Sequence, residues 1–316
     1  MTGKSSHSPL RVGIAGCGRI VERGYLPALR DADGVAVAAL ADPDRGRARR
    51  LAALCGAAIY DSASAMIAAG GLDAVVVATP ADRHLEVAEE AAAADLPTLV
   101  EKPPTTGLED ALALAALDPA PAFAFNRRFL QGAELRPLVP PAGWLELELE
   151  LRFRRDGWGA HVSRDEALLD AGTHLIDLAI FLADSEPIAV REALVAPERA
   201  SLELELGRGR ARIRCATDRP YAERVEVRDR AGGLLGAART DRMRARARRM
   251  RGGGDPLVSS LRAQAERFAA RVRGESAEEL GGPAAAVGTM AVVEAVRRSA
   301  ALDGAEVTVA VPEGVA

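Results

Sequence analysis

An apolar segment that runs directly into a glycine-rich turn is the feature that most restricts how this chain can fold. Residues 10–15 predict a short strand, Gly16-Cys17-Gly18 follows at once, and the next residues predict a helix. In such a unit the first glycine allows the tight turn, and the second lets the backbone approach a pyrophosphate at the helix N-terminus. Val21 replaces the third glycine of this fingerprint, so the motif needs support from the rest of the chain.

An acidic residue follows at the expected distance. The apolar run 35–41 ends in Asp42, 24 positions after Gly18, where such units place the carboxylate that accepts a ribose 2′-hydroxyl. This carboxylate would repel a 2′-phosphate, which favours NAD over NADP, although Arg45 and Arg47 could offset the repulsion. The same segment also fits a turn and a helix N-cap, and the two roles are compatible.

Strand-like and helix-like segments keep alternating up to residue 126. Residues 48–54, 63–69 and 84–94 predict helices. Residues 72–78 and 98–100 predict buried strands. This alternation predicts a Rossmann-type doubly wound parallel sheet, with ligands at the carboxyl ends of its strands. We therefore assign residues 9–126 to a dinucleotide-binding domain and residues 127–316 to a second domain.

Strict alternation of apolar and charged side chains marks the second half. Residues 145–153 place Leu or Phe at odd positions and Glu or Arg at even ones, which predicts a half-buried strand. Similar alternation at 202–206, 211–215 and 224–228 predicts a mixed, largely antiparallel sheet in an α+β domain. One face would pack on a helix over 165–182. The other face would carry cross-strand charge pairs of about 0.2–1 kcal/mol each.

Three polar residues lie in an apolar stretch that predicts a helix. Asp170, His174 and Asp177 are spaced i, i+4 and i+7, so they would share one helix face. A carboxylate one turn from an imidazole can fix its tautomer and raise its basicity, and histidine titrates near the pH where proton transfer is useful. An ordinary polar helix surface is the alternative, but apolar residues surround the three.

Composition restricts the partners and the compartment. The net charge of −4 gives no general attraction to nucleic acid or anionic membranes. Three cysteines without CxxC spacing predict a reducing compartment, and four histidines show no metal-ligand cluster. The first nine residues lack the apolar region of a signal peptide, and charges interrupt every apolar run before membrane length. We expect a cytoplasmic protein that needs no metal and binds neither membrane nor nucleic acid.

Seven arginines between residues 239 and 251 form the most unusual segment. It could be a basic arm for a phosphate-bearing ligand, or a mobile, solvated loop, and we favour the loop. Nucleic-acid binding is less favoured still, because no aromatic residues are interleaved.

Together, these motifs resemble those of the Gfo/Idh/MocA family of NAD(P)-dependent oxidoreductases over nearly the whole chain. The resemblance is carried by Gly16-Cys17-Gly18-Arg19-Ile20, Asp42-Pro43-Asp44, Ala78-Thr79-Pro80 with His84, Glu101-Lys102-Pro103, Asn126-Arg127-Arg128-Phe129 and Asp170-Ala171-Gly172-Thr173-His174-Leu175-Ile176-Asp177. The Glu-Lys-Pro and Asp-x-Gly-x-His elements together are the most specific part. Ser163-Arg164-Asp165-Glu166-Ala167 replaces the glycines that members often have before the last element.

The resemblance implies a dehydrogenase or reductase that transfers hydride between nicotinamide and a CH–OH or ketone group of a sugar, cyclitol or sugar derivative. Lys102 would lie between nicotinamide and substrate, and His174 would be the general acid/base. Asp170 would bind substrate or tune His174. The Lys102–Pro103 peptide would often be cis. A homodimer or homotetramer formed through the C-terminal sheet is implied, while a charged face is also compatible with plain solvation.

The expected site residues fall into three groups. The catalytic group is Lys102, His174 and Asp170. The group that binds NAD, with NADP as a second possibility, is Gly16, Gly18, Arg19, Ile20, Asp42, Thr79, Pro80, His84, Glu101 and Lys102. The substrate-binding group is Lys102, Arg127, Arg128, Asp170 and His174.

Two other functions are compatible with the same fold. One is a non-catalytic NAD(P)-binding sensor, since fold does not fix function. The other is a redox-neutral hydrolysis or elimination that uses transient oxidation by bound NAD. The intact Lys102, Asp170 and His174 argue against the sensor, and net NADH formation would exclude the redox-neutral enzyme.

Overall fold

The computed structural model describes residues 8–155, 166–250, 254–275 and 279–312, and the chain divides into two compact units. Unit 1 comprises Met1–Asn126 and Pro256–Ala284, and unit 2 comprises Arg127–Asp255 and Ala285–Ala316. The predicted boundary at residue 126 puts residues 256–284 in the second domain. The structure instead packs helix α9 (Pro256–Val272) on the first helices of unit 1, where Leu261 and Phe268 are buried. Whether each unit folds as an independent domain stays a prediction.

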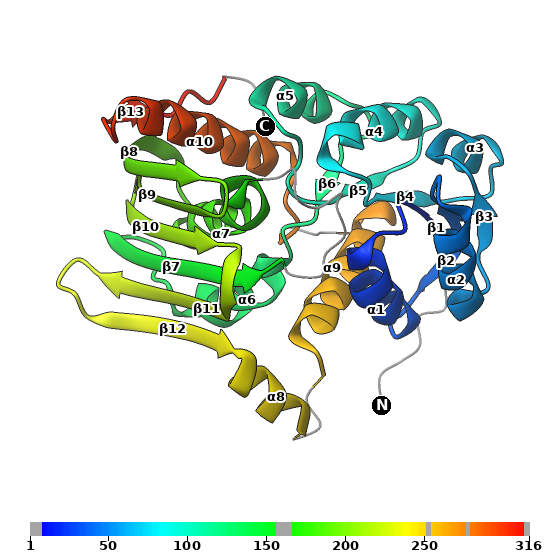
Figure 1. Ribbon diagram of the computed structural model, residues 1–316, viewed down its shortest axis with the longest axis horizontal. Coiled ribbons are helices and arrows are strands. Elements are labelled where there is room, and N and C mark those ends of the chain that lie inside the picture. Colours follow the sequence, from blue (N-terminus) through cyan, green and yellow to red (C-terminus); the bar gives the residue numbers. More distant parts are fainter. Residues whose placement is uncertain (1–7, 156–165, 251–253, 276–278, 313–316) are drawn as a thin grey trace. The chain divides into compact units, whose positions relative to one another are not determined.

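Unit 1 is built on a six-stranded parallel sheet in the order β3-β2-β1-β4-β5-β6 (Figure 1). Its strands are β1 (Leu10–Ala15), β2 (Val35–Ala41), β3 (Ala58–Tyr60), β4 (Ala74–Val77), β5 (Thr98–Val100) and β6 (Ala122–Phe123). This order is that of a Rossmann sheet, so the predicted doubly wound sheet is confirmed. The sequence analysis missed β3 and β6, because three and two residues are too few to show a period.

Unit 1 contains several helical segments, two of which begin at a side-chain N-cap. They are η1 (Val21–Tyr25), α1 (Leu26–Arg30), α2 (Arg45–Cys55), α3 (Ala63–Ala68), η2 (Ala81–Arg83), α4 (His84–Ala93), α5 (Leu108–Ala115) and α9. The side chains of Asp44 and Ser62 cap α2 and α3 by accepting backbone N–H groups, and Gly56 ends α2 in the left-handed conformation. The 3-10 segment η3 (Asn126–Phe129) connects to unit 2.

Unit 2 contains a seven-stranded sheet in the order β12-β11-β7-β10-β9-β8-β13. Its strands are β7 (Leu145–Arg154), β8 (Pro187–Ala196), β9 (Arg199–Leu206), β10 (Gly209–Ala216), β11 (Asp218–Asp229), β12 (Leu234–Asp241) and β13 (Val307–Thr308). Only β7 and β10 pair in parallel, so the predicted mixed, largely antiparallel sheet is confirmed. The leucines of β7 are buried and its glutamates are half-buried, as the alternation predicts.

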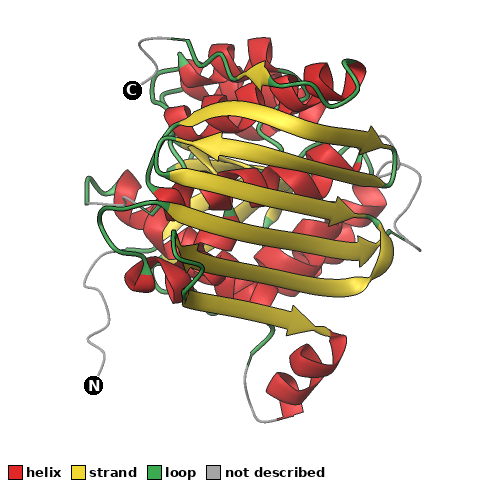
Figure 2. Ribbon diagram, turned by 90° about the vertical axis from the view of Figure 1, so that its left-hand side faces the viewer, coloured by secondary structure: helices red, strands yellow, loops and turns green. Residues whose placement is uncertain are grey.

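The two faces of this sheet differ in character. The described part of the helical stretch predicted over 165–182 is η6 (Leu168–Gly172) followed by α7 (Thr173–Ala183), and both pack on the apolar face. The other helices of the unit are α6 (Gln131–Leu135), η4 (Arg136–Leu138), α8 (Arg242–Met250) and α10 (Pro283–Ala301). Figure 2 shows the strands in front of the helices, with no helix drawn over the near face.

Cross-strand charge pairs line the polar face. Glu226 in β11 pairs with Arg239 on the neighbouring strand β12, and also with Arg224 and Arg228 on its own strand. Glu203 in β9 pairs with two more arginines, one on each neighbouring strand. The expected pairs between strands of opposite charge are therefore present.

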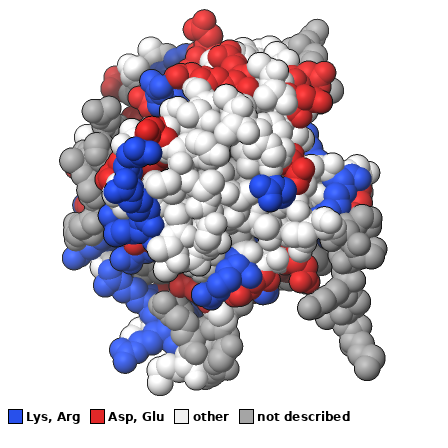
Figure 3. Space-filling model, turned by 90° about the vertical axis from the view of Figure 1, so that its right-hand side faces the viewer, with Lys and Arg blue, Asp and Glu red and all other residues white. Residues whose placement is uncertain are grey.

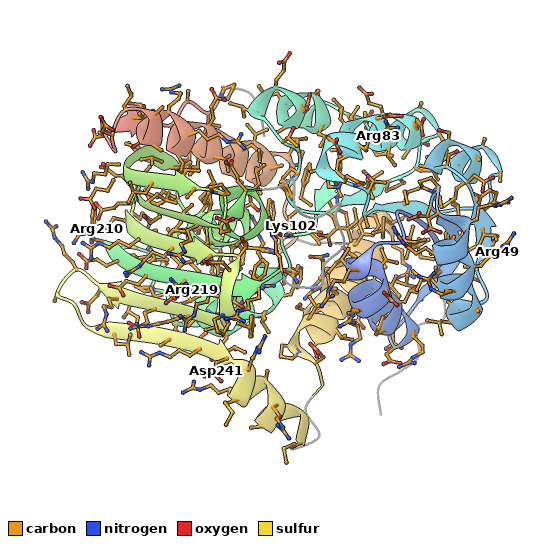
Figure 4. The ribbon with its side chains drawn as sticks, viewed as in Figure 1. Arg49, Arg83, Lys102, Arg210, Arg219 and Asp241 are labelled. Carbon is orange, nitrogen blue, oxygen red and sulfur yellow. The ribbon has the colours of Figure 1, made fainter. Side chains whose placement is uncertain are left out.

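The preferred interpretation of the arginine-rich segment as a loop was wrong over residues 242–250. These residues form helix α8, which begins after Asp241 at the end of β12 (Figure 4). The Asp241 carboxylate accepts the backbone N–H of Arg244 at 2.8 Å, which is an N-cap bond. Arginine, alanine and methionine are among the strongest helix formers, so local propensity and the cap outweigh the charge repulsion.

The surface shows charges of both signs. Figure 3 views the side on which α3 and β3 lie in Figure 1; most side chains at its centre are uncharged, and basic and acidic groups gather towards the rim. Within the described residues, no helix is long and apolar enough to cross a membrane.

Candidate functional site

The glycine turn after β1 has the geometry of a dinucleotide cradle. Gly16 has a φ of 92°, and a Cβ there would lie 2.4 Å from the carbonyl oxygen of Ala78, so only glycine fits. At Gly18 the position of a Cβ has no heavy atom within 4 Å, so open space lies beside the start of the helix. The following Arg19 is exposed and Ile20 is half-buried. This open helix start fits the pyrophosphate of NAD.

Asp42 supports the glycine turn from the end of β2. The buried carboxylate accepts the backbone N–H of Cys17 at 2.7 Å and that of Asp44 at 2.8 Å. The guanidinium of Arg47 lies 3.6 Å from it. The turn role predicted for this segment is therefore present, and Arg47 is near enough to lower the local negative charge.

His84 links two segments at the carboxyl ends of the strands. Its Nε2 lies 2.9 Å from the carbonyl oxygen of Thr79, and its Nδ1 lies 3.1 Å from that of Pro104. Burial, the largest cause, lowers the pKa of His84 despite these two contacts. The Thr79 hydroxyl is buried and has no hydrogen-bond partner in the described chain, so a bound ligand could satisfy it. Pro80 is exposed.

Lys102 is the second residue after β5 and is half-buried (Figure 4). The Lys102–Pro103 peptide is cis, as the resemblance implies. The carboxylate of buried Glu101 accepts the Tyr25 hydroxyl at 2.8 Å and the backbone N–H of Lys102 at 3.0 Å. Sequence reasoning missed Tyr25, which lies 76 positions from its partner.

The amino-acid composition singles out Lys102. Of 41 lysines and arginines, only Lys4 and Lys102 are lysines. Lys102 is therefore the single lysine among the described residues. A chain that uses arginine for almost every cation keeps a lysine here, which indicates a need for a compact charge or a transferable proton.

In unit 2, Asp170 and His174 are both 7% exposed. Asp170 lies in the π-helical turn η6, and His174 lies in the first turn of α7. Such wide turns often occur at functional sites. Arg155, just after β7, places its Nε 2.9 Å and its Nη2 2.8 Å from Oδ2 of Asp170. Sequence reasoning missed Arg155, because no pattern links it to the Asp-x-Gly-x-His element.

The two arginines expected to grip substrate hold carboxylates of unit 2. Arg128 makes a two-pronged pair with Asp177, at 2.9 and 2.6 Å, and lies over the ring of Phe181. Burial raises the pKa of Asp177, and Arg128 opposes that shift. Arg127 pairs with Glu223 at 2.8 Å. A role for Arg127 and Arg128 in substrate binding stays a prediction. Most of the atypical stretch 163–167, and all of 156–165, lies outside the described residues.

The sheet order and the glycine turn together define an NAD-binding Rossmann unit. Residues 10–119 match the family model described as an oxidoreductase family with an NAD-binding Rossmann fold. This match confirms the resemblance to the Gfo/Idh/MocA family over residues 10–119, and NAD as the cofactor of this unit.

Two curated relatives share about a third of their aligned residues with this chain. Inositol 2-dehydrogenase of Leifsonia xyli is 35% identical over 188 residues, covering 57% of this chain and 55% of the relative. D-apiose dehydrogenase of Paraburkholderia graminis is 32% identical over 187 residues, covering 54% and 48%. The chain thus spans about half the length of these relatives.

A solved structure supports the fold over the whole chain. The structure of GenD2 from gentamicin A biosynthesis, in complex with NAD, has a TM-score of 0.80 and 20% identity, and covers 98% of this chain and 99% of that one. At this identity the likeness shows the fold alone.

Proposed function

We propose that this protein is an NAD-dependent oxidoreductase acting on a CH–OH or ketone group of a sugar, cyclitol or sugar derivative. The observation that carries the proposal is Lys102, a lone lysine held at the carboxyl end of β5 in a unit of an NAD-binding family. Similarity to an inositol and an apiose dehydrogenase supports the substrate class.

The cofactor and the chain would divide the work. Bound NAD supplies the hydride acceptor for oxidation. Gly16, Gly18 and Asp42 would hold it through the turn and the end of β2, with Thr79, Pro80, His84 and Glu101 shaping the neighbouring loops. The remaining chemistry is proton transfer and charge stabilisation, which fall to the chain's own side chains.

In this proposal His174 accepts the hydroxyl proton of the substrate. Lys102 donates a charge-assisted hydrogen bond to the same oxygen and stabilises the negative charge that develops on it. Asp170, paired with Arg155, orients His174 or a neighbouring hydroxyl. These roles explain why a lysine, a histidine and a carboxylate are needed, and they require no metal ion.

Assembly and location complete the proposal. We infer a homodimer or homotetramer formed through the charged face of the seven-stranded sheet, which no helix of unit 2 is seen to cover in Figure 2. Light scattering of the purified protein tests this. We also infer a cytoplasmic location, supported by cysteines that are all unbridged, two of them buried.

The first experiment measures reduction of NAD and of NADP across cyclitols, hexoses, pentoses, sugar acids and sugar nucleotides. His174→Ala should lower turnover by about 100-fold or more and leave NAD affinity nearly unchanged. Lys102→Met should act in the same direction. A His174→Ala protein with wild-type turnover would refute the assignment. Tight NAD binding without net NADH on any substrate would favour the sensor or the redox-neutral enzyme.

A further inference from the structure

A buried hydrogen-bond chain runs from α9 to the backbone of Lys102. Gln264 donates from Nε2 to the Tyr25 hydroxyl at 3.3 Å, and Tyr25 donates to Oε1 of Glu101 at 2.8 Å. Oε2 of Glu101 accepts the backbone N–H of Lys102 at 3.0 Å. All four residues belong to unit 1.

The three residues that lead to Lys102 in this series of hydrogen bonds are almost entirely removed from solvent. Tyr25 and Gln264 have no exposed surface, and Glu101 is 7% exposed. Burial, with smaller contributions from Glu101, holds the pKa of Tyr25 well above its usual value, so its hydroxyl stays protonated. A protonated hydroxyl that donates to Glu101 can only accept from Gln264, which fixes the direction of each bond.

The order of these bonds makes Tyr25 a support for Lys102. Glu101 is a buried carboxylate, and such a group is stable only when its oxygens accept hydrogen bonds. One oxygen is fixed by Tyr25 from the helix that follows the glycine turn. The other oxygen is thereby aimed at the backbone N–H of Lys102.

We propose that Tyr25, with Gln264 behind it, is a positioning residue that sets the backbone of Lys102 through the carboxylate of Glu101. The effect on activity rests on the catalytic role proposed for Lys102, whereas the effect on the Lys102 backbone does not. Misplacing a catalytic group by a fraction of an ångström lowers turnover much more than it weakens cofactor binding.

The scarcity of lysine allows a direct test. In the full chain grown with ¹⁵N-lysine, the amide spectrum contains two signals, from Lys4 and Lys102, and Lys4→Arg leaves only the second. That second amide is the one that donates to Glu101. Its chemical shift and its hydrogen-exchange rate therefore measure changes in the hydrogen bond between Lys102 and Glu101, without any assay of activity.

Tyr25→Phe removes one oxygen and keeps the ring. The Lys102 amide signal should move and its exchange should quicken, and kcat should fall on the order of tenfold. The Kd for NAD should stay within about twofold. Gln264→Met should cause a smaller change of the same sign, and it covers the case in which Tyr25→Phe does not fold. Tyr60→Phe is the matched control for the signal, because Tyr60 lies in β3 and three strands separate β3 from β5.

Each outcome decides one question. An unmoved Lys102 signal, within the change seen for Tyr60→Phe, overturns the proposal whatever the activity. A moved signal with unchanged kcat overturns the positioning role, provided that Lys102→Met is inactive. If Lys102→Met retains full turnover, the proposed function fails, while the signal still tests the link from Tyr25 to Lys102.

Discussion

At the scale of single residues, the candidate catalytic groups are linked to residues that lie far from them in sequence. The Lys102 amide donates to Glu101, which accepts from the distant Tyr25, and Asp170 accepts from Arg155. The motifs themselves were visible in the sequence, because glycine turns and short fixed spacings are local. Their supports were not, because a partner 15 or 76 positions away leaves no periodic trace.

Replacing Arg155 should expose this dependence. In Arg155→Met, Asp170 remains largely buried but loses its guanidinium, so the free energy of unfolding should fall by about 3 kcal/mol. Asp170→Asn in the same chain removes the buried charge, and the double variant should therefore recover much of that loss. Urea unfolding of the four proteins measures the coupling. Losses that simply add would show that the two side chains act independently.

At the scale of elements, the clarity of the sequence pattern decided which strands could be predicted. The ten residues of β7 alternate without exception up to Phe153, and the structure follows them. By contrast, β12 contains two adjacent leucines, a glycine and two adjacent alanines, so it shows no period of two. Helix α8 was not predicted, because its many arginines suggested a solvated loop. The only local sign of a helix start was the N-cap residue Asp241, and a single residue is a weak signal.

The charge cluster that joins β11 to β12 should give stability that depends on pH. Hydrogen bonding to Arg239, with Arg224 and Arg228, lowers the pKa of Glu226 to about 2. Because the folded pKa lies below that of the unfolded chain, the stabilisation is complete above about pH 5 and is lost as pH falls towards 2. Glu226→Gln should be less stable than wild type at pH 7, and the difference should shrink steadily on acidification.

Denaturant unfolding between pH 7 and pH 3 provides the measurement. Glu146→Gln is the matched control, since its single pair with Arg210 is about one-third exposed and should contribute little. If the difference in the free energy of unfolding between Glu226→Gln and wild type stays constant with pH, the expectation is wrong.

At the scale of the whole molecule, the two predicted fold classes were correct, but the membership of residues 256–284 was not visible. The helical pattern of α9 shows which of its faces is apolar but not which unit receives that face. Its contacts with η1 and α1 depend on tertiary details, such as the missing side chain of Gly24, where a Cβ would lie 2.5 Å from Leu261.

A fragment ending at residue 126 should therefore be incomplete. Without α9 it lacks the contacts of Leu261 and Phe268 and the partner of Tyr25, each of which is buried in the intact chain. We expect it to melt without a sharp transition and to lose NAD binding, and addition of a peptide spanning 256–275 should restore both in part. Circular dichroism and calorimetry check this. Cooperative melting of the fragment alone would show that α9 is dispensable.

Because α9 belongs to unit 1 but follows most of unit 2 in the sequence, unit 1 stays incomplete for part of the protein's synthesis. A ribosome that has completed residue 126 must still add roughly 146 residues before the end of α9 exists. At about 5–20 residues per second this takes about 7–30 s. During that interval the nascent nucleotide-binding unit has an uncovered apolar surface. Unit 1 is therefore the part that we expect to need chaperone protection as the protein is made, although its first residues leave the ribosome first.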